Sequence, residues 1–548
     1  MGKILEKPVL FLTILTLLCG YLFFFQSGKM ALTDPDETFY AQTAKEMLAR
    51  NEWVTPYLYD KPQFEKPILF YWLVEASYKV FGINEFAARF PSAVFGLIGV
   101  IAIYFLGALL FGKRAGMLSA VMLAVNVEYV ILSRACVTDM VLSTFMLLGA
   151  LFFFYGYLKG KNYFYLLSAA GFGLATLTKG PVAILLAGSI IFIYLILAKD
   201  LKSIKKMPVL LMALVFTITA APWYLIAYKL HGMSFIDAFF GFHNVTRFLE
   251  AEHKIGSQFY YNVPVVLGGF FPWSVFLPVG LWNMFKRGRN KFKPEIFVLV
   301  WFFVIFIFFS ISSTKLPTYI FPCFMSLALV TGVFWDDFLK GLTGKKIVKQ
   351  MAVSYYILSA VIVLGAIGAL LYIKHGYPVV LKGVLISSLF LIFGMALSFA
   401  AFLKKKFFWA FFLVVYSLAI FLIPLGMLVI PDIELYETSK EVSGRLLSLM
   451  KPAEMLGSES NHLAGLAFYT GKFPADLDKH DIMVQFMNSD KRVWGVMKEK
   501  NYKQLYDPGV NPEYVKPSYL VYKIGKRAIV TNGLPDNGRY ILKGERSK

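Results

Sequence analysis

Three carboxylates stand within four residues of one another in the stretch TDPDETFYAQTAKEML, residues 33–48, at the start of a helical pattern. Carboxylates can act as general bases or orient a reacting group, so the stretch is a candidate for chemistry. Two of the three have a simpler explanation. Asp34 suits the N-cap of a helix, Pro35 suits its first position, and Glu37 suits its third position as a capping-box partner. Asp36 has no such capping role and is the first candidate site residue.

A second charged pair follows in the stretch YDKPQFEKPILFYWL, where Glu65 and Lys66 precede a proline and a strongly aromatic helical pattern. An adjacent acid and base can be no more than an ion pair at the membrane interface, which contributes little to stability. The same lysine could instead bind an anion, because a lysine ammonium is a point charge that suits phosphate. Both interpretations stay open at this point.

Further charged and polar residues recur where apolar runs end. They are Asp139 in RACVTDM, Lys179 in LTKGP, Lys315 and Tyr319 in STKLPTYIFP, and His243, Arg247 and His253 in the segment 230–262. Any one of these cations could simply reach the membrane interface along its own side chain. Taken together they predict one polar cavity that binds a phosphate group, because ionisable residues beside membrane spans are costly and usually functional.

Membrane helices are the elements that must position these residues. The chain has 548 residues, 58% of them hydrophobic, which excludes an ordinary soluble globular protein. Thirteen apolar runs are long enough to cross a hydrocarbon core of roughly 30 Å. They are approximately 8–26, 88–110, 116–134, 140–158, 162–178, 181–198, 207–229, 263–285, 294–313, 318–336, 351–373, 379–402 and 407–430. We therefore predict a polytopic α-helical membrane protein. No small-residue cleavage site follows the first run, so a cleaved signal peptide is not expected.

Basic residues in the connections predict the orientation of these spans. With the N-terminus inside, the inner connections collect 22 Lys and Arg residues and the short outer turns collect four. This asymmetry follows the positive-inside rule and explains most of the net charge of +21, so no nucleic-acid partner is needed. Two longer segments, 27–87 and 230–262, are predicted to lie outside. In the first, an apolar stripe suits a juxtamembrane helix lying along the membrane surface: Phe39, Tyr40, Thr43, Met47 and Leu48.

The same alternation places residues 431–548 outside, after a transmembrane domain at 1–430. SKEVSGRLLSLM in this part is typical of a helix, while SYLVYKI and RAIVTN are typical of strands, so we expect a small α/β domain. The three cysteines, Cys19, Cys136 and Cys323, all lie in or beside apolar runs. A disulfide framework in the outer domain and a cysteine metal cluster are therefore excluded.

Eight motifs occur along the chain in one order: DPDETFYAQTAKEML, FEKPILFYWL, FAARFPSAVFG, TDM, LATLTKGPV, APWY, PWSVFLP and STKLPTYIFP. In this order they resemble the bacterial lipid A aminoarabinose transferases. That family belongs to the superfamily of lipid-phosphate-sugar glycosyltransferases with the GT-C fold, which includes protein O-mannosyltransferases. The resemblance covers roughly residues 34–322 by motif, and the rest by its plan of thirteen spans and a small outer domain. Single motifs of this kind are weak, but eight in order are specific for the superfamily.

The resemblance implies transfer of a sugar, 4-amino-4-deoxy-L-arabinose in the type case, from an undecaprenyl-phosphate carrier to lipid A or a similar acceptor. The reaction would take place at the periplasmic face of the bacterial inner membrane. The absence of a glycine-rich phosphate loop agrees with a donor that carries no nucleotide. The main alternative is a relative that moves another sugar to another lipid, glycan or protein. A transporter is less well supported, because its ionisable groups usually lie near the membrane midplane and internal repeats are common. A purely structural membrane protein would not explain the repeated outer charges.

Residue by residue, the resemblance assigns catalytic roles to the family's first and second outer acids, which fall on Asp36 and Asp139. The residues that it implies for binding the donor phosphate are Lys66, Lys179, Arg247, Tyr319 and Tyr40. Others expected at the cavity are Glu65, Glu37, Lys315 and His243. A divalent metal is conceivable, with Glu65 and His243 as its candidate ligands. One position departs from the family pattern: Phe39 stands where an arginine is common, so a cationic contact of the family is absent here.

Overall fold

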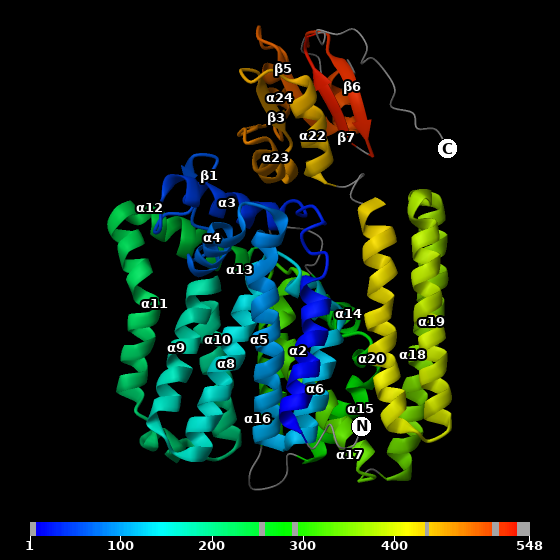
Figure 1. Ribbon diagram of the computed structural model, residues 1–548. Coiled ribbons are helices and arrows are strands. Elements are labelled where there is room, and N and C mark those ends of the chain that lie inside the picture. Colours follow the sequence, from blue (N-terminus) through cyan, green and yellow to red (C-terminus); the bar gives the residue numbers. More distant parts are fainter. Residues whose placement is uncertain are drawn as a thin grey trace.

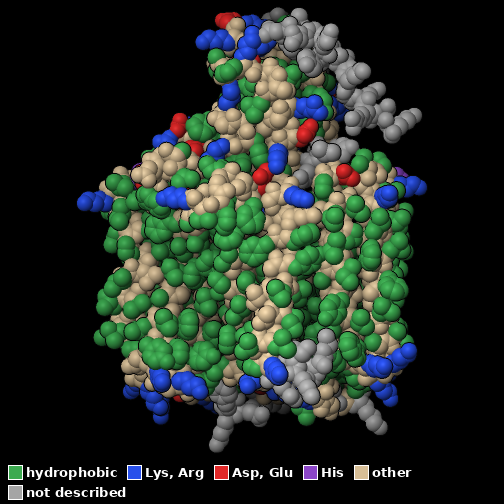
Figure 2. Space-filling model, in the orientation of Figure 1, with side chains coloured by type: hydrophobic (Ala, Val, Ile, Leu, Met, Phe, Trp, Pro, Cys, Tyr) green, Lys and Arg blue, Asp and Glu red, His purple; other side chains and the backbone are tan. Residues whose placement is uncertain are grey.

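The computed structural model describes residues 7–250, 258–287, 294–342, 344–432, 438–506, 515–525 and 527–533. Long helices form a bundle, and a smaller part with a β-sheet lies at one end of it (Figure 1). On the face shown in Figure 2, hydrophobic side chains form a broad band over the bundle, and Lys and Arg side chains gather at the end opposite the sheet. The chain is thus a multi-pass membrane protein of mostly helical structure.

Eight helical segments in the described residues are long and apolar enough to cross a membrane. They are α5 (Glu85–Phe111), α8 (Thr138–Lys159), α11 (Val209–His231), α16 (Pro294–Ile311), the segment Pro317–Leu339 that ends in α17 (Phe324–Leu339), α18 (Lys345–Gly376), the segment Pro378–Leu403 that ends in α19 (Leu381–Leu403), and α20 (Phe407–Pro424). Shorter or less apolar helices lie beside them: α2 (Pro8–Phe24), α9 (Asn162–Lys179) and α10 (Val182–Leu197).

Two predicted spans are broken into bent pairs. The run at 116–134 forms α6 (Lys113–Val125) and α7 (Val127–Ser133), which meet at 66°. Asn126 causes the break because its side chain caps α7 by accepting from the Tyr129 amide. The run at 263–285 forms α14 (Asn262–Gly269) and the segment 273–287, which holds α15 (Leu277–Arg287), at 111°. Pro272 stands at this second break and has no amide proton to continue a helix. If each pair counts as one span, the described residues hold up to ten, and the predicted count of thirteen stays a prediction.

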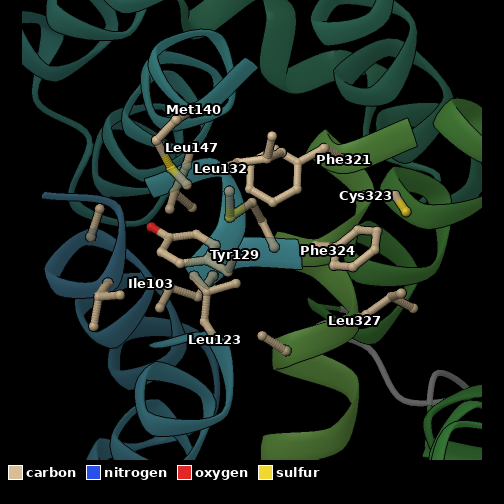
Figure 3. Close-up of a cluster of buried hydrophobic side chains, with 14 of the residues drawn as sticks. Ile103, Leu123, Tyr129, Leu132, Met140, Leu147, Phe321, Cys323, Phe324 and Leu327 are labelled. Atoms are coloured by element: carbon tan, nitrogen blue, oxygen red, sulfur yellow. The ribbon is translucent and has the colours of Figure 1, made fainter. Parts of the chain in front are cut away.

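One buried cluster fixes the spans that carry site residues. Side chains from α5, α6, α7 and α8, including Tyr129 and Met140, pack against Phe321 in the turn before α17 and against Phe324 at the start of α17 (Figure 3). The Tyr129 hydroxyl donates to the Gly96 carbonyl oxygen over 2.7 Å, which satisfies its polar group inside the cluster. The cluster therefore holds the start of α8, where Asp139 lies, next to the turn that carries Tyr319.

The first outer segment forms two helices and a short hairpin: α3 (Asp36–Arg50), β1 (Tyr57–Leu58), β2 (Lys61–Pro62) and α4 (Leu69–Phe81). One expectation about it stays a prediction, and another is wrong. The apolar stripe of α3 packs inside the protein, because Tyr40, Thr43 and Met47 are buried where the helix packs on α4 and on the C-terminal part, and the position of the helix along the membrane surface stays a prediction. Asp34 is not its N-cap, since the helix begins at Asp36 after Pro35 with no side-chain cap.

The C-terminal part is an α/β unit, as expected. Its helices are α22 (Ser439–Leu449), α23 (Leu463–Thr470), α24 (His480–Met487) and α25 (Glu499–Leu505), and its strands are β3 (Met455–Ser458), β4 (Ala475–Asp476), β5 (Val493–Lys498), β6 (Tyr519–Ile524) and β7 (Arg527–Thr531). The sheet order is β4-β3-β5-β7-β6, with β3 parallel to β4 and β5 and with β7 antiparallel to β5 and β6. Successive β5 residues alternate between two buried clusters, so the sheet is covered on both faces.

Polar contacts dock this part onto the first outer segment. The Asp34 carboxylate accepts from the Ser439 hydroxyl over 2.5 Å, and the Lys45 ammonium donates to the Phe468 carbonyl oxygen over 2.7 Å. The Tyr469 hydroxyl accepts from the Leu32 amide over 2.8 Å. The Asp34 carboxylate thus binds Ser439 of the C-terminal part and does not cap α3. The domain boundary at residue 430 and the outer placement of 431–548 stay predictions.

Candidate active site

A cavity of about 660 Å³ lies where the outer segments meet the ends of the membrane helices. Its polar lining comes from Glu65, Lys66, Lys179, His243, Ser312, Thr314 and Tyr319. Its apolar lining comes from Leu142, Pro181, Val182, Ala183, Ile184, Leu185, Leu186, Phe248, Leu249, Phe308, Phe309 and Pro322. A cavity of this size with few polar groups among many apolar ones suits a ligand that is part charged and part hydrocarbon.

Lys179 and Asp139 meet at one side of this cavity. Lys179 is the last residue of α9 and Asp139 lies in the first turn of α8, and the two form an ion pair. Each charge complements the dipole of its own helix, because acids favour helix starts and bases favour helix ends. The Lys179 ammonium also lies 4.7 Å from the centre of the Tyr319 ring, a cation–π distance. The ammonium is therefore held in place by two contacts beside the cavity.

Lys66 and Glu65 form the second charged pair, with 3.0 Å between Nζ and Oε1. They lie in the turn before α4, and Gln63 orders this turn. The Gln63 side chain accepts from the Glu65 amide over 2.9 Å and donates to the Tyr71 hydroxyl over 2.9 Å. Sequence reasoning missed Gln63, and only its place two residues before Glu65 could have drawn attention to it.

Asp36 is the first residue of α3 and lies close enough to both pairs to interact with their charges. Partial loss of solvent raises the pKa of its carboxyl above the usual value, and repulsion by Asp139 and Glu65 adds to this rise. Attraction by Lys66 and Lys179 opposes it. The structure thus brings five predicted residues into one electrostatic group, with the two lysines and Glu65 on the cavity wall.

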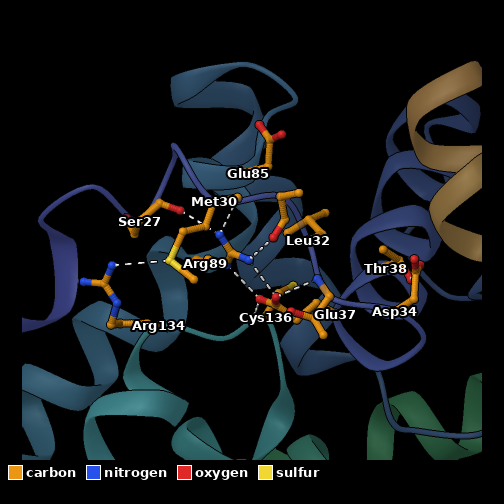
Figure 4. A network of polar contacts seen from close by, with 12 residues as sticks. Ser27, Met30, Leu32, Asp34, Glu37, Thr38, Glu85, Arg89, Arg134 and Cys136 are labelled. Carbon is orange, nitrogen blue, oxygen red and sulfur yellow. Dashed lines mark hydrogen bonds and ion pairs between the residues drawn. The ribbon is translucent and has the colours of Figure 1, made fainter. Parts of the chain in front are cut away.

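Glu37 does not line the cavity. Its carboxylate is 5% exposed and pairs with the buried Arg89, with 2.8 Å from Nε to Oε1 and 2.7 Å from Nη2 to Oε2. It also accepts from the amides of Thr33 and Cys136 (Figure 4). Burial alone would raise the pKa of Glu37, but Arg89 and these hydrogen bonds lower it overall. Glu37 therefore fixes the start of α3, which is a larger role than the capping box that we expected.

Tyr40 is also absent from the cavity lining. Its ring is 8% exposed and packs on Phe70 and Tyr71, with ring centres 5.4 Å and 6.0 Å away. Tyr40 thus joins α3 to α4, and its predicted contact with the donor phosphate stays a prediction.

The remaining predicted residues differ in their placement. His243 lies in a π-helical turn, Asp237–Thr246, and lines the cavity. Lys315 is buried beside the lining residue Thr314, and burial lowers the pKa of its ammonium. The Arg247 side chain and all of His253 lie outside the described residues. Glu65 and His243 both reach the cavity, but no group of three or more potential metal ligands forms within the described ranges.

Comparisons with known proteins show the family to which this chain belongs. Residues 65–226 match the family described as dolichyl-phosphate-mannose-protein mannosyltransferase. A protein of Aquifex aeolicus (strain VF5) is 31% identical over 356 residues, which cover 64% of this chain and 68% of that one. An undecaprenyl phosphate-alpha-4-amino-4-deoxy-L-arabinose arabinosyl transferase of Yersinia pestis (strain Pestoides F) is 32% identical over 315 residues, which cover 56% of each chain. The chain belongs to the aminoarabinose transferase family. The matched region spans little more than half the length of the Yersinia transferase.

Solved structures show that this family member has the GT-C fold. The crystal structure of ArnT from Cupriavidus metallidurans bound to undecaprenyl phosphate superimposes with a TM-score of 0.80, at 21% identity, over 96% of this chain and 98% of that one. The archaeal oligosaccharyltransferase AglB from Archaeoglobus fulgidus superimposes with a TM-score of 0.54 at 13% identity, over 92% of this chain and 71% of that one. The expected fold is therefore confirmed, and at these identities the likeness concerns the fold alone.

Proposed function

We propose that this aminoarabinose transferase family member is a membrane glycosyltransferase that moves 4-amino-4-deoxy-L-arabinose from undecaprenyl phosphate to a phosphate of lipid A. Its N-terminus lies in the cytoplasm, and its site and residues 431–548 face the periplasm of a bacterial inner membrane. Family membership and the basic residues of the inner connections support this assignment.

The observation that carries the proposal is the composition of the cavity wall. Lys66 and Lys179 supply two cations, which suit the carrier phosphate, and the aliphatic and aromatic side chains beside them suit the start of a prenyl chain. Asp36 lies close enough to both cations for their charges to lower the pKa of its carboxyl. A phosphate bound between the lysines therefore places the sugar that it carries within reach of that carboxylate.

The transfer breaks the bond between C1 of the sugar and an oxygen of the carrier phosphate, and forms a bond between C1 and an acceptor oxygen. The carrier leaves as a phosphate dianion. Lys66 and Lys179 stabilise the negative charge that develops on its departing oxygen. An acceptor phosphate is already anionic and needs little deprotonation, so Asp36 orients it or binds the sugar amine. If the acceptor is instead a hydroxyl, Asp36 takes its proton as a general base.

A second candidate keeps the donor class and changes the sugar or the acceptor. It is favoured by Phe39, which stands where the family commonly has a cation and whose ring packs on Tyr40 at 5.3 Å. An aromatic ring there cannot make the contact with an anion that an arginine would make. The family description that matches residues 65–226 also names a protein acceptor for its members.

Mass spectrometry of lipid A from cells with and without the gene tests the two candidates. The first predicts lipid A that carries aminoarabinose only when the gene is present. Unchanged lipid A, together with a sugar that appears on another lipid, glycan or protein, would replace it with the second candidate. Cells that express Asp36→Asn serve as the matched control, because this change removes one charge from the site.

A further inference from the structure

A second cavity lies between the end of α2 and the residues that follow α20. It has a volume of about 130 Å³ and adjoins a smaller one of about 40 Å³. Both are lined by Gln26, Arg134, Gly426 and Ile430, so together they form one cleft. None of these residues lines the proposed transfer site, so the proposed function assigns no role to the cleft.

Two cations stand at the wider part of this cleft. The Arg134 guanidinium donates from Nη1 to the carbonyl oxygens of Leu22, over 3.0 Å, and Phe25, over 2.9 Å. In Figure 4 it lies apart from the Arg89–Glu37 pair, and its only drawn contact is the Met30 sulfur. Lys29 is exposed at the same cavity. Neither cation pairs with a carboxylate in the part of the chain that the structure describes, so the cleft presents net positive charge.

The narrower part of the cleft is apolar. Besides the four residues that it shares with the wider part, it is lined by Tyr21, Leu22, Phe25, Val130, Leu422 and Leu425. Because α2 runs from the end opposite the sheet toward the end that carries it, Tyr21 and Leu22 lie deeper in the hydrophobic band than Lys29 (Figure 1). Cations at the membrane boundary above an apolar slot match a lipid whose phosphate lies at the interface and whose acyl chain enters the bilayer.

We infer that this cleft binds one phospholipid with an anionic headgroup, whose phosphate contacts Arg134 and Lys29 and whose acyl chain lies against Leu22 and Leu422. Charge decides the class of lipid. A zwitterionic headgroup carries its own cation, which two neighbouring cations repel, whereas a glycerol phosphate headgroup carries none.

Native mass spectrometry of the full chain with added phosphatidylglycerol or phosphatidylcholine tests the inference. Lys29→Gln removes one cation that supports no described contact. Gly426→Leu fills the cleft, since a side chain there points to open space with only the Gln26 amide oxygen nearby, at 3.6 Å. Gly426→Ala leaves most of the space free and is its matched control. Lys374→Gln is the control for charge, because Lys374 is an exposed cation at the end of α18 and does not line the cleft.

The expected result is one tightly held phosphatidylglycerol on the wild type and on both control variants. Lys29→Gln and Gly426→Leu should bind it about tenfold more weakly, the scale of one charge-assisted contact. Equal retention of phosphatidylcholine would overturn the assignment of an anionic lipid. Displacement of the lipid by a similar concentration of inorganic phosphate would show a simple anion site and would also overturn it. Because no arm measures sugar transfer, failure here leaves the proposed function untouched.

Discussion

Asp139 and Lys179 form an ion pair that joins the first turn of α8 to the last residue of α9. The two helices run antiparallel, which brings residues forty positions apart to the same end of the bundle. The pair and the Tyr319 ring keep the Lys179 ammonium beside the cavity, where a phosphate can reach it. A cation that is ordered before its ligand arrives loses less freedom on binding, and this favours affinity.

Lys179→Met should weaken binding of the carrier phosphate by about 2 kcal/mol, which is roughly thirtyfold in Kd. Lys179→Arg should recover part of the loss, because it restores the charge with a different shape. Binding of undecaprenyl phosphate to the purified variants measures both effects. If Lys179→Met binds the carrier as the wild type does, the lysine serves only to pair Asp139.

Asp36→Asn and Glu37→Gln should have opposite effects, although the two residues are neighbours. Asp36→Asn should abolish transfer and leave the free energy of unfolding nearly unchanged, since the residue as a whole is exposed, although its carboxyl is partly desolvated. Glu37→Gln should cost about 3 kcal/mol of stability, because it leaves the buried Arg89 without its counter-charge. Thermal unfolding and transfer assays on the same preparations separate the two. Normal stability of Glu37→Gln would contradict the importance of the buried pair.

The pH dependence of transfer should report the Asp36 carboxyl. Since its pKa is raised by loss of solvent and by Asp139 and Glu65, activity should fall with acid at a higher pH than for an ordinary aspartate. Asp139→Asn removes one of the repelling charges, so the acid limb of its residual activity should move to lower pH. Profiles of kcat/KM for the wild type and this variant make the comparison. An unchanged limb would mean that another group controls it.

Local sequence pattern predicts several residues of this site, but it cannot predict the contacts between segments that are far apart in the chain. Asp36, Lys66 and Lys179 stand out in the sequence because charges beside apolar runs are rare. The partner of Glu37 does not stand out, since Arg89 lies 52 residues away within an apolar pattern. Burial of α3 depends on α23, whose contacts come from more than 400 residues later in the chain. Long-range packing of this kind leaves no periodic signal in either segment. The bend at Asn126 could not be predicted either, because a single polar residue hardly changes the mean hydropathy of the apolar run that contains it.

The docking of α23 should influence transfer through Asp34 and the start of α3. A methyl group in Gly465→Ala would meet the Asp34 carboxylate and lie 2.7 Å from Ser439 Cβ. The displacement should shift Asp36, two residues after Asp34, and lower kcat about tenfold, since small misplacements of a reacting group are costly. Gly444→Ala in α22 meets nothing within 4 Å and should behave as the wild type. Equal kcat for both variants would show that this contact only holds the C-terminal part.

Transfer by the purified chain in proteoliposomes is the most direct test of the account. The assay supplies undecaprenyl phosphate-linked aminoarabinose and lipid A, and mass spectrometry follows the sugar from one to the other. The wild type and Lys61→Met, which changes an exposed lysine of the same outer segment, should transfer it. Lys66→Met keeps the packing of the lysine stem but should neither bind the donor nor turn it over. Normal turnover by Lys66→Met would contradict the account, because the pair of Lys66 and Glu65 would then be only structural.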